Sequence, residues 1–320
     1  MASAAEIPPR LQHLREQLDR IVIGQARVKE QLLICLLAGG HGLVEGVPGT
    51  AKTLLVLSLS RLVGSRFKRV QFTPDLMPVD LLGTNVFNPK TQEFVFHPGP
   101  IFTDLLLADE VNRTPPKTQS ALLEAMQEKC VTLDGTRHEV SPVFTVFATQ
   151  NPVEFEGTYP LPEAQRDRFL LKIGIGFPAF EEEAQMMAAY ASGRRLHDEA
   201  LAELQPVVTR EELAALRKAL VQSVRVDPNI QTYILRLISA TRTDEAVQYG
   251  AGPRASLALL ESSRALALLR GRGFVIPDDI KELAAPVLLH RVTLTPEAEM
   301  EGFTLDDVLK RIFDKTEVPR

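Results

Sequence analysis

Residues 45–53 read EGVPGTAKT, directly after the apolar run Leu43-Val44 and before the helical pattern of residues 54–57. A strand, a glycine-rich turn and a helix in this order form the context that the phosphate-binding pattern G-x-x-x-x-G-K-[ST] requires. An alanine, Ala51, stands where that pattern has its last glycine. We expect this position to lie at the helix entry, where φ is already negative and a methyl group is tolerated. The stretch therefore predicts a phosphate-binding loop, with a glycine-rich turn that carries a surface lysine as the alternative.

The residues of this loop have predicted roles in binding a nucleotide. Backbone amides of the loop and of the helix N-terminus would face the β-phosphate. Lys52 would neutralise the β- and γ-phosphates, and the hydroxyl of Thr53 would hold Mg²⁺. The predicted nucleotide-binding residues here are Gly46, Val47, Pro48, Gly49, Thr50, Ala51, Lys52, Thr53 and Leu54.

Two acidic residues, Asp109 and Glu110, follow the apolar run of residues 105–108. Ligands of open α/β sheets bind at the carboxyl ends of the strands, so Asp109 and Lys52 are expected to converge on one crevice. Asp109 is predicted to bind Mg²⁺ through water. Glu110 is placed to orient or deprotonate a water that attacks the γ-phosphate. For the acidic pair by itself, a solvated strand end is the alternative.

The other apolar runs predict an α/β domain followed by a helical one. Strand-like runs alternate with helical patterns, which is typical of a mostly parallel sheet covered on both faces; the predicted strands are residues 42–44, 70–73, 105–108, 143–148 and 169–173. Two segments, around Asp134-Gly135 and around residues 88–90, resemble hairpins. After about Gly176 the pattern is almost wholly helical. We therefore predict an α/β nucleotide-binding domain over residues 1–176 and an α-helical lid domain over residues 177–320.

The composition of the 320 residues is that of a folded protein without a membrane span, with 45% hydrophobic and 24% charged residues. The 36 Lys and Arg against 41 Asp and Glu give a net charge of −5, which does not favour nucleic acid as a ligand. Cys35 and Cys130 are far apart, which predicts neither a zinc site nor disulfides and suits the reducing cytoplasm. The spacing of Leu11, Leu14 and Leu18 predicts an amphipathic N-terminal helix rather than a signal peptide.

Several strings of the sequence resemble those of MoxR-family AAA+ ATPases, and the similarity covers nearly the whole chain. They are VIGQ (22–25), GVPGTAKT (46–53), QFTPDLMPVDLLGT (71–84), LADEVNRTPPKTQSALLEAMQE (107–128), FATQNPVEFEGTYPLPEAQRDRF (147–169) and GAGPRASLALL (250–260). Alanine before the lysine is usual in this family, so the resemblance favours a working nucleotide site. It also implies an α/β P-loop NTPase fold of the AAA+ type, with a parallel sheet between helices and a smaller all-α lid, and ATP and Mg²⁺ as cofactors.

The same resemblance implies roles for residues outside the loop and the acidic pair. Val22, Ile23 and Gly24 would line the adenine pocket, with a turn between two helices as the alternative. Asn151 matches the sensor 1 position, where an amide bonds the γ-phosphate and the attacking water; an Asn-Pro turn is the alternative. Arg254 matches sensor 2, which would bring the helical lid onto the nucleotide bound between the two domains.

A catalytic arginine from a neighbouring subunit is a further implication. Arg168 matches the family's arginine finger, which contributes on the order of 10³–10⁵ in rate. Arg166 stands where many relatives carry leucine, and Arg113 follows the acidic pair, so both remain candidates, with structural ion pairing as the alternative for all three. Gln71 would restrain Glu110 until a partner binds.

The resemblance implies an ATP-hydrolysing machine that acts as a ring, most simply a hexamer, in which an isolated protomer hydrolyses ATP poorly. The hairpins near residues 84–97 and 131–140 would engage client protein, with solvated edge hairpins as the alternative. MoxR proteins act as chaperones that assemble or activate other proteins, commonly with a von Willebrand A domain partner. Two other functions stay open: a nucleic-acid-remodelling AAA+ motor, which the acidic balance disfavours, and a nucleotide-gated scaffold, which the Asp109-Glu110 pair disfavours.

Overall fold

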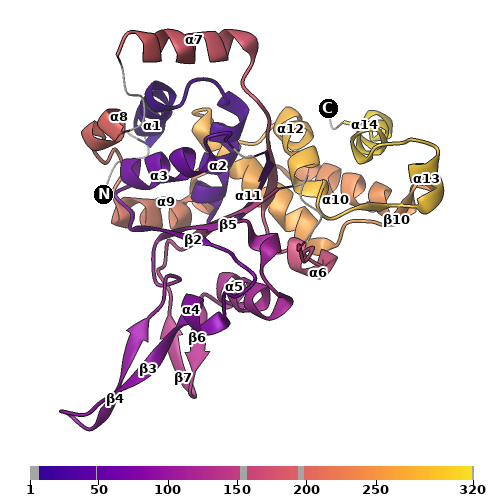
Figure 1. Cartoon of the computed structure of the whole chain (residues 1–320). Coiled ribbons are helices and arrows are strands. Elements are labelled where there is room, and N and C mark those ends of the chain that lie inside the picture. Colours follow the sequence, from indigo (N-terminus) through magenta and orange to yellow (C-terminus); the bar gives the residue numbers. More distant parts are fainter. Residues whose placement is uncertain (1–6, 48, 152–156, 194–197, 319–320) are drawn as a thin grey trace.

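The structure is a computed structural model that describes residues 7–47, 49–151, 157–193 and 198–318. Its centre is a sheet of five parallel strands in the order β2-β5-β8-β1-β9 (Figure 1). The strands are β1 (Gly42–Gly46), β2 (Phe67–Gln71), β5 (Leu105–Asp109), β8 (Thr145–Gln150) and β9 (Leu171–Ile175). The predicted parallel α/β sheet is confirmed, with its strands shifted by a few residues along the sequence.

Side chains of the sheet alternate between two hydrophobic cores, one on each face. On β5, Leu105 and Leu107 belong to one core, whereas Leu106 and Ala108 belong to the other. Strands β1 and β8 divide their side chains between the same two cores. Successive side chains of a strand point to opposite faces, so an unbroken apolar run marks a strand that is buried on both sides.

Helices cover both faces of this sheet (Figure 1). One core is shared with α1 (Ile7–Ile21), α2 (Ala26–Ala38) and α3 (Lys52–Leu62), and the other with α4 (Pro78–Leu82) and α5 (Pro116–Glu128). Leu11, Leu14 and Leu18 of α1 are at most 2% exposed, which confirms the predicted amphipathic helix. A short 3₁₀ turn (Val111–Arg113) and α6 (Glu163–Arg166) lie in the connections.

Two hairpins extend from the body on the side of α4 and α5 (Figure 1). They consist of β3 (Gly83–Asn88) with β4 (Glu93–Pro98), and of β6 (Cys130–Leu133) with β7 (Thr136–Glu139). Both central residues of the second turn have positive φ, 48° at Asp134 and 78° at Gly135. This conformation matches the twist of the flanking strands, and it explains why an Asp-Gly pair was a reliable signal.

The region after β9 is mainly helical, as predicted. Its helices are α7 (Phe180–Ala191), α8 (Asp198–Glu203), α9 (Arg210–Ser223), α10 (Pro228–Thr243), α11 (Pro253–Leu269), α12 (Pro277–Leu288), α13 (Pro296–Met300) and α14 (Leu305–Lys315). The sequence did not predict the short antiparallel pair β10 (Val247–Tyr249) and β11 (Thr293–Leu294). The domain boundary at residue 176 stays a prediction. Within the described ranges, no helix has both the length and the apolar character needed to cross a bilayer.

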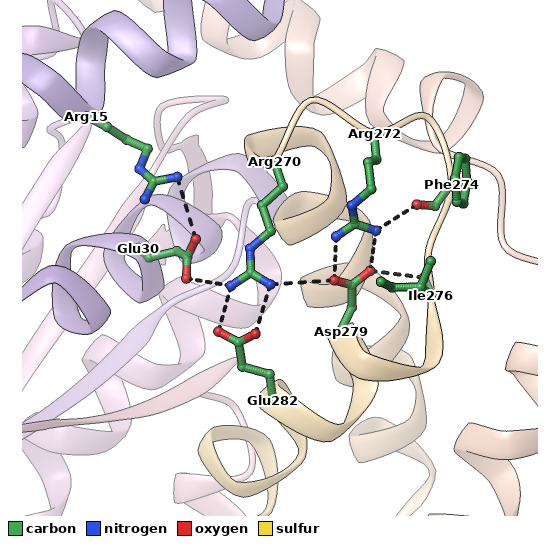
Figure 2. A network of polar contacts seen from close by, with 8 residues as sticks. All are labelled: Arg15, Glu30, Arg270, Arg272, Phe274, Ile276, Asp279 and Glu282. Atoms are coloured by element: carbon green, nitrogen blue, oxygen red, sulfur yellow. Dashed lines mark hydrogen bonds and ion pairs between the residues drawn. The ribbon is translucent and has the colours of Figure 1, made fainter. Parts of the chain in front are cut away.

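A network of charged side chains joins the C-terminal helices to the N-terminal ones (Figure 2). Arg270, at the end of α11, donates to Glu282 of α12 at 2.7 Å and to Glu30 of α2 at 3.1 Å. Arg15 of α1 lies 3.8 Å from the same Glu30. The hydrogen bonds to Glu282 raise the pKa of Arg270 above its usual value. Since the hydrophobic core is also continuous from α2 to α11 and α12, the helical region is packed against the body.

Candidate functional site

The loop between β1 and α3 lies at the carboxyl edge of the sheet. Gly46 ends β1 so close to β9 that a Cβ on it would come within 2.4 Å of the Ile175 carbonyl oxygen. Gly49 has φ +83°, in the left-handed region that favours glycine. The backbone therefore requires both glycines, as in a loop that wraps around phosphate. Pro48, also predicted to bind nucleotide, lies outside the described residues.

Ala51 does not have the negative φ that we expected. Its φ is 61° and its ψ 22°, which is the left-handed conformation. The expectation was wrong because α3 begins at Lys52, so Ala51 belongs to the turn and not to the helix. An L-residue with a Cβ is destabilised by about 1 kcal/mol in this conformation, and glycine at this position of the general pattern avoids that cost.

The ammonium group of Lys52 lies inside the loop. Its Nζ donates to the carbonyl oxygens of Gly46 at 2.6 Å and Val47 at 3.2 Å. Burial lowers the pKa of Lys52, whereas the negative charges of Asp109 and Glu110 act in the opposite direction. The loop thus holds a positive charge within electrostatic reach of the two acids.

Asp109 ends β5 at the same edge and is only 8% exposed. Its Oδ1 accepts a hydrogen bond from the hydroxyl of Thr149 at 2.6 Å. Its Oδ2 accepts two from the guanidinium of Arg69, from Nε at 3.0 Å and from Nη2 at 2.6 Å. Both carboxylate oxygens are therefore fixed by neighbouring strands.

Glu110 directly follows and has φ 58°, which turns the chain away from the strand. Its backbone N–H donates to the Thr149 hydroxyl at 2.8 Å. Its side-chain Oε2 accepts from Nε2 of Gln71 at 2.6 Å and lies 3.2 Å from Nε of Arg113. The structure thus brings Gln71 and Glu110 together as the sequence suggested, while the role of this contact stays a prediction.

Asn151 follows the last residue of β8 and is 6% exposed. Because β8 lies between β5 and β1 and runs parallel to both, its carboxyl end is at the edge that carries Asp109 and the loop. Thr149, one strand position before the end, already contacts Asp109. The fold therefore gathers the predicted phosphate-binding, metal-binding and water-activating residues at one edge.

The segment predicted to line the adenine pocket lies at this edge as well. Val22 is buried and Gly24 is half-buried with φ +71°. The side chain of Gln25 donates to the carbonyl oxygen of Gly176 at 2.9 Å. Gly176 directly follows β9, and the end of β9 packs against Gly46 of the loop. The hydrogen bond from Gln25 to Gly176 therefore places residues 22–25 close to the loop.

Arg168 lies at the opposite edge of the sheet. It precedes Leu171, where β9 begins, and Leu171 pairs with Gly42 at the start of β1. Strands rise about 3.3 Å per residue, so the full length of β1 separates Arg168 from Gly46. Arg168 is thus remote from the loop of its own chain.

Arg254, in the first turn of α11, lies at this opposite edge with Arg168. Its Nη1 is 3.6 Å from Oδ2 of Asp167, and Oδ1 of the same carboxylate accepts from Nε of Arg291 at 2.8 Å. Helix α11 packs on α2 and its first turn contacts the segment before β9, so Arg254 lies beside Asp167; its role in nucleotide binding stays a prediction.

A cavity of about 270 Å³ lies between these arginines. The charged side chains in its lining are Lys129, Asp167, Arg168, Arg254, Glu261 and Arg291. The other two finger candidates lie elsewhere: Arg113 contacts Glu110 at the carboxyl edge, and Arg166 lies 4.0 Å from Glu163. Cations outnumber acids in the cavity, so it suits an anionic ligand.

The donor atoms at the carboxyl edge fit magnesium. Across the described ranges, no three His, Cys, Asp or Glu side chains gather into a metal cluster. Mg²⁺ binds through one or two carboxylates together with phosphates and water rather than in a cage of protein ligands. A single carboxylate, Asp109, and a hydroxyl, Thr53, beside a phosphate-binding loop match this preference.

Sequence reasoning missed Arg69 and Thr149, the two residues that hold Asp109. Thr149 contacts Asp109 because β8 neighbours β5, and the order of strands in a sheet is not written in the chain. A signal for Arg69 existed, since it lies two residues before Gln71 on a strand and therefore on the same face. The Glu182 carboxylate, which packs against Gly24, was also not anticipated.

Comparisons with known families agree with this arrangement. Residues 41–171 match the family described as "ATPase family associated with various cellular activities (AAA)", and residues 239–312 match the AAA lid domain. The first match contains the loop, the acidic pair, Asn151 and Arg168, and the second contains Arg254.

Individual proteins resemble the chain over nearly its whole length. The uncharacterized protein YeaC of Bacillus subtilis is 45% identical, over 100% of this chain and 98% of its own length. Chaperone MoxR1 of Mycobacterium tuberculosis is 42% identical, over 95% of this chain and 81% of its own. A solved structure from Cytophaga hutchinsonii, described as an inferred ATPase, superposes with a TM-score of 0.90 at 38% identity, over 99% of this chain and 97% of that one.

Proposed function

The chain belongs to the MoxR family of AAA+ ATPases, and from this membership we propose that it hydrolyses Mg-ATP in a ring of identical subunits to remodel client proteins. One observation carries the proposal. The residues for binding and attack lie at one edge of the sheet, whereas Arg168 lies at the other.

At the carboxyl edge, the chain's own residues would bind the nucleotide and activate water. The loop amides and Lys52 hold the phosphates, while Thr53 and Asp109 hold Mg²⁺. The metal, when bound, neutralises charge on the phosphates. Glu110 accepts the proton of the attacking water, and the amide of Asn151 orients that water.

At the opposite edge, Arg168 and Arg254 would act on the nucleotide of a neighbouring subunit. Neither reaches the loop of its own chain, but a head-to-tail contact in a ring brings this edge to the next subunit's carboxyl edge. Their positive charges would then stabilise the transition state. This assigns Arg254 to the neighbour's site, in place of the role at its own nucleotide that the family resemblance first suggested.

The hairpins are the proposed client-binding elements. Around the first turn, Phe94 is 71% exposed and Phe87 49%, and the cross-strand pair Val86 and Val95 is also exposed. Exposed apolar side chains gathered on one projecting element are typical of surfaces that bind other proteins. From the family resemblance we further propose a hexameric ring, a von Willebrand A domain partner and a cytoplasmic location.

Mixing two inactive variants tests the shared site. Glu110→Gln removes the base and Arg168→Ala the finger, so each variant alone should hydrolyse ATP at least about 100-fold more slowly than the parent. Random co-assembly restores an intact interface wherever Glu110 of one subunit meets Arg168 of the next, which is about a quarter of interfaces. We expect recovery of activity on that order in the mixture.

Mixing Glu110→Gln with Lys52→Ala is the matched control. Lys52 and Glu110 of one site belong to the same subunit, and every subunit of this mixture lacks one of the two. No site in the mixture is therefore complete, and activity should not return. No recovery in the first mixture, although both variants bind nucleotide and enter one ring, would contradict the shared site.

A further inference from the structure

Arg69 connects the two acids of the site. Its Nη2 lies 2.6 Å from Oδ2 of Asp109 and 3.2 Å from Oε1 of Gln71. The amide nitrogen of Gln71 in turn donates to Oε2 of Glu110 at 2.6 Å. One guanidinium group therefore touches the predicted metal ligand directly and the predicted general base through a single side chain.

The contact of Arg69 with Asp109 is strong and specific. Two N–H groups of the guanidinium converge on the single oxygen Oδ2, while the hydroxyl of Thr149 occupies Oδ1. Charge-assisted hydrogen bonds of this kind are roughly twice as strong as neutral ones. The Asp109 side chain is 11% exposed and that of Arg69 48%, so Arg69 can move into solvent while Asp109 stays in place.

We propose, on the basis of the proposed Mg-ATP site, that Arg69 is a positioning residue that competes with Mg²⁺ for Asp109. In the nucleotide-free site Arg69 neutralises this carboxylate. Loading of Mg-nucleotide displaces the guanidinium from Oδ2, because the hydrated metal would need this carboxylate oxygen to accept from its bound water.

Displacement of Arg69 also removes a constraint on Glu110. The side chain of Gln71 is held at its oxygen by Arg69 and binds Glu110 through its nitrogen. When Arg69 leaves, Gln71 loses this anchor and its hold on Glu110 weakens. Occupancy of the metal site is thereby linked to release of the base.

The magnesium dependence of nucleotide binding tests the competition. ADP binding to the full chain is measured by calorimetry over a series of free Mg²⁺ concentrations, for the parent and for Arg69→Gln. Arg69→Gln removes the competing cation. The Mg²⁺ concentration at which half of the Mg²⁺-dependent increase in ADP affinity is reached should therefore be about tenfold lower than in the parent. Lys68→Gln is the matched control, since Lys68 is the neighbouring exposed cation on β2, and it should stay within about twofold of the parent.

Arg69→Lys separates the two parts of the proposal. Lysine keeps the charge but lacks the planar fork, so the Mg²⁺ requirement should return toward that of the parent while the link to Gln71 is lost. Basal hydrolysis should rise in Arg69→Lys and in Gln71→Ala, and the double variant should exceed the higher single variant by less than about twofold. Additive effects would overturn the link to Glu110.

Equal Mg²⁺ dependence in the parent and in both Arg69→Gln and Arg69→Ala, with normal ADP binding, would overturn the competition while leaving the proposed function intact. Failure of the parent to bind either ADP or ATP at any Mg²⁺ concentration would overturn both. Thermal unfolding of each variant verifies that the folded protein is compared.

Discussion

The imidazole of His41 is buried just before β1, at the edge of the sheet that carries the arginines. Its Nδ1 accepts from the backbone N–H of Val146 at 2.9 Å, so the proton is on Nε2, which lies 3.3 Å from the Met126 carbonyl oxygen. Each nitrogen of the neutral ring thus has a hydrogen-bond partner. A second proton, on Nδ1, would point at the N–H of Val146, which is itself a donor. Burial lowers the pKa of His41 to about 4, and the charge of Arg217 adds to this effect.

This depressed pKa predicts a loss of stability in mild acid. Above about pH 6.5, His41 is neutral in both the folded and the unfolded chain; between about pH 6.5 and pH 4, only the unfolded chain takes up the proton. The free energy of unfolding should therefore fall by about 3 kcal/mol as the pH drops through this window. Below about pH 4 the folded chain is protonated as well, so the contribution of His41 no longer changes with pH. Urea unfolding at a series of pH values measures the effect.

The variant His41→Gln identifies the group responsible, because it removes the titrating ring and should flatten part of the pH dependence. His13→Gln on α1 is the control, since the side chain of His13 is 55% exposed, and its profile should follow that of the parent. Identical slopes for the parent and His41→Gln would contradict the assignment.

At the scale of elements, the turn and one strand of the second hairpin contact the base of the first hairpin and leave the tip of the first exposed. Nδ2 of Asn85 donates to Asp134 across the gap at 2.7 Å, and the ring of Phe96 stacks on His138 with centroids 4.0 Å apart. A lone two-stranded hairpin is marginally stable in water, so these contacts explain how both elements keep a defined shape. The tip residues are then available for contacts with another protein.

The double variant Phe87→Ser and Phe94→Ser should leave the fold intact and weaken client capture. Both side chains are exposed, so unfolding free energy should change by less than about 1 kcal/mol. Suppression of aggregation of a chemically unfolded model protein should fall several-fold, because the apolar contact area is lost. Leu235→Ser on α10, where leucine is 59% exposed, is the control. Unchanged suppression would argue that the hairpins are merely solvated edges.

At the scale of the whole molecule, the C-terminal helices are attached to the body through α2. The continuous core and the Arg270 network make this attachment, and it places Arg254 beside Arg168. In the proposed shared site, each subunit would present its loop at one edge and its arginines at the other, so that the nucleotide state of one subunit could affect the next. A closed head-to-tail ring, as proposed above, would bring these two edges of neighbouring subunits together.

Arg270→Ala should destabilise the protein by about 1–2 kcal/mol, because it removes hydrogen bonds to Glu282 and Glu30 that are partly screened by solvent. Arg236→Ala is the matched control, since its pair with Glu317 is exposed at 3.8 Å and should contribute less than about 0.5 kcal/mol. Denaturant unfolding compares the two. Equal effects would show that the network does not anchor the helices.

The sequence by itself determined the elements whose signal is local. The five strands were predicted because a strand buried on both faces needs an unbroken apolar run, and the Asp134-Gly135 turn because few residue pairs tolerate two positive φ values. The loop and the acidic pair were predicted for the same reason, since phosphate binding and metal binding require particular residue types at fixed spacing. The local pattern predicted the wrong backbone conformation for Ala51, because its left-handed φ depends on the residue at which the helix starts.

Only the tertiary structure decided which of these residues meet. Arg69 and Thr149 contact Asp109 because β2 and β8 flank β5, and strand order is a property of the packed sheet. The position of Arg254 beside Asp167 likewise depends on how α11 packs against α2, which burial of apolar surface decides over the whole chain. Hydrophobic packing is non-directional and joins residues that are far apart in the sequence. A short motif therefore does not predict which helices and strands become neighbours.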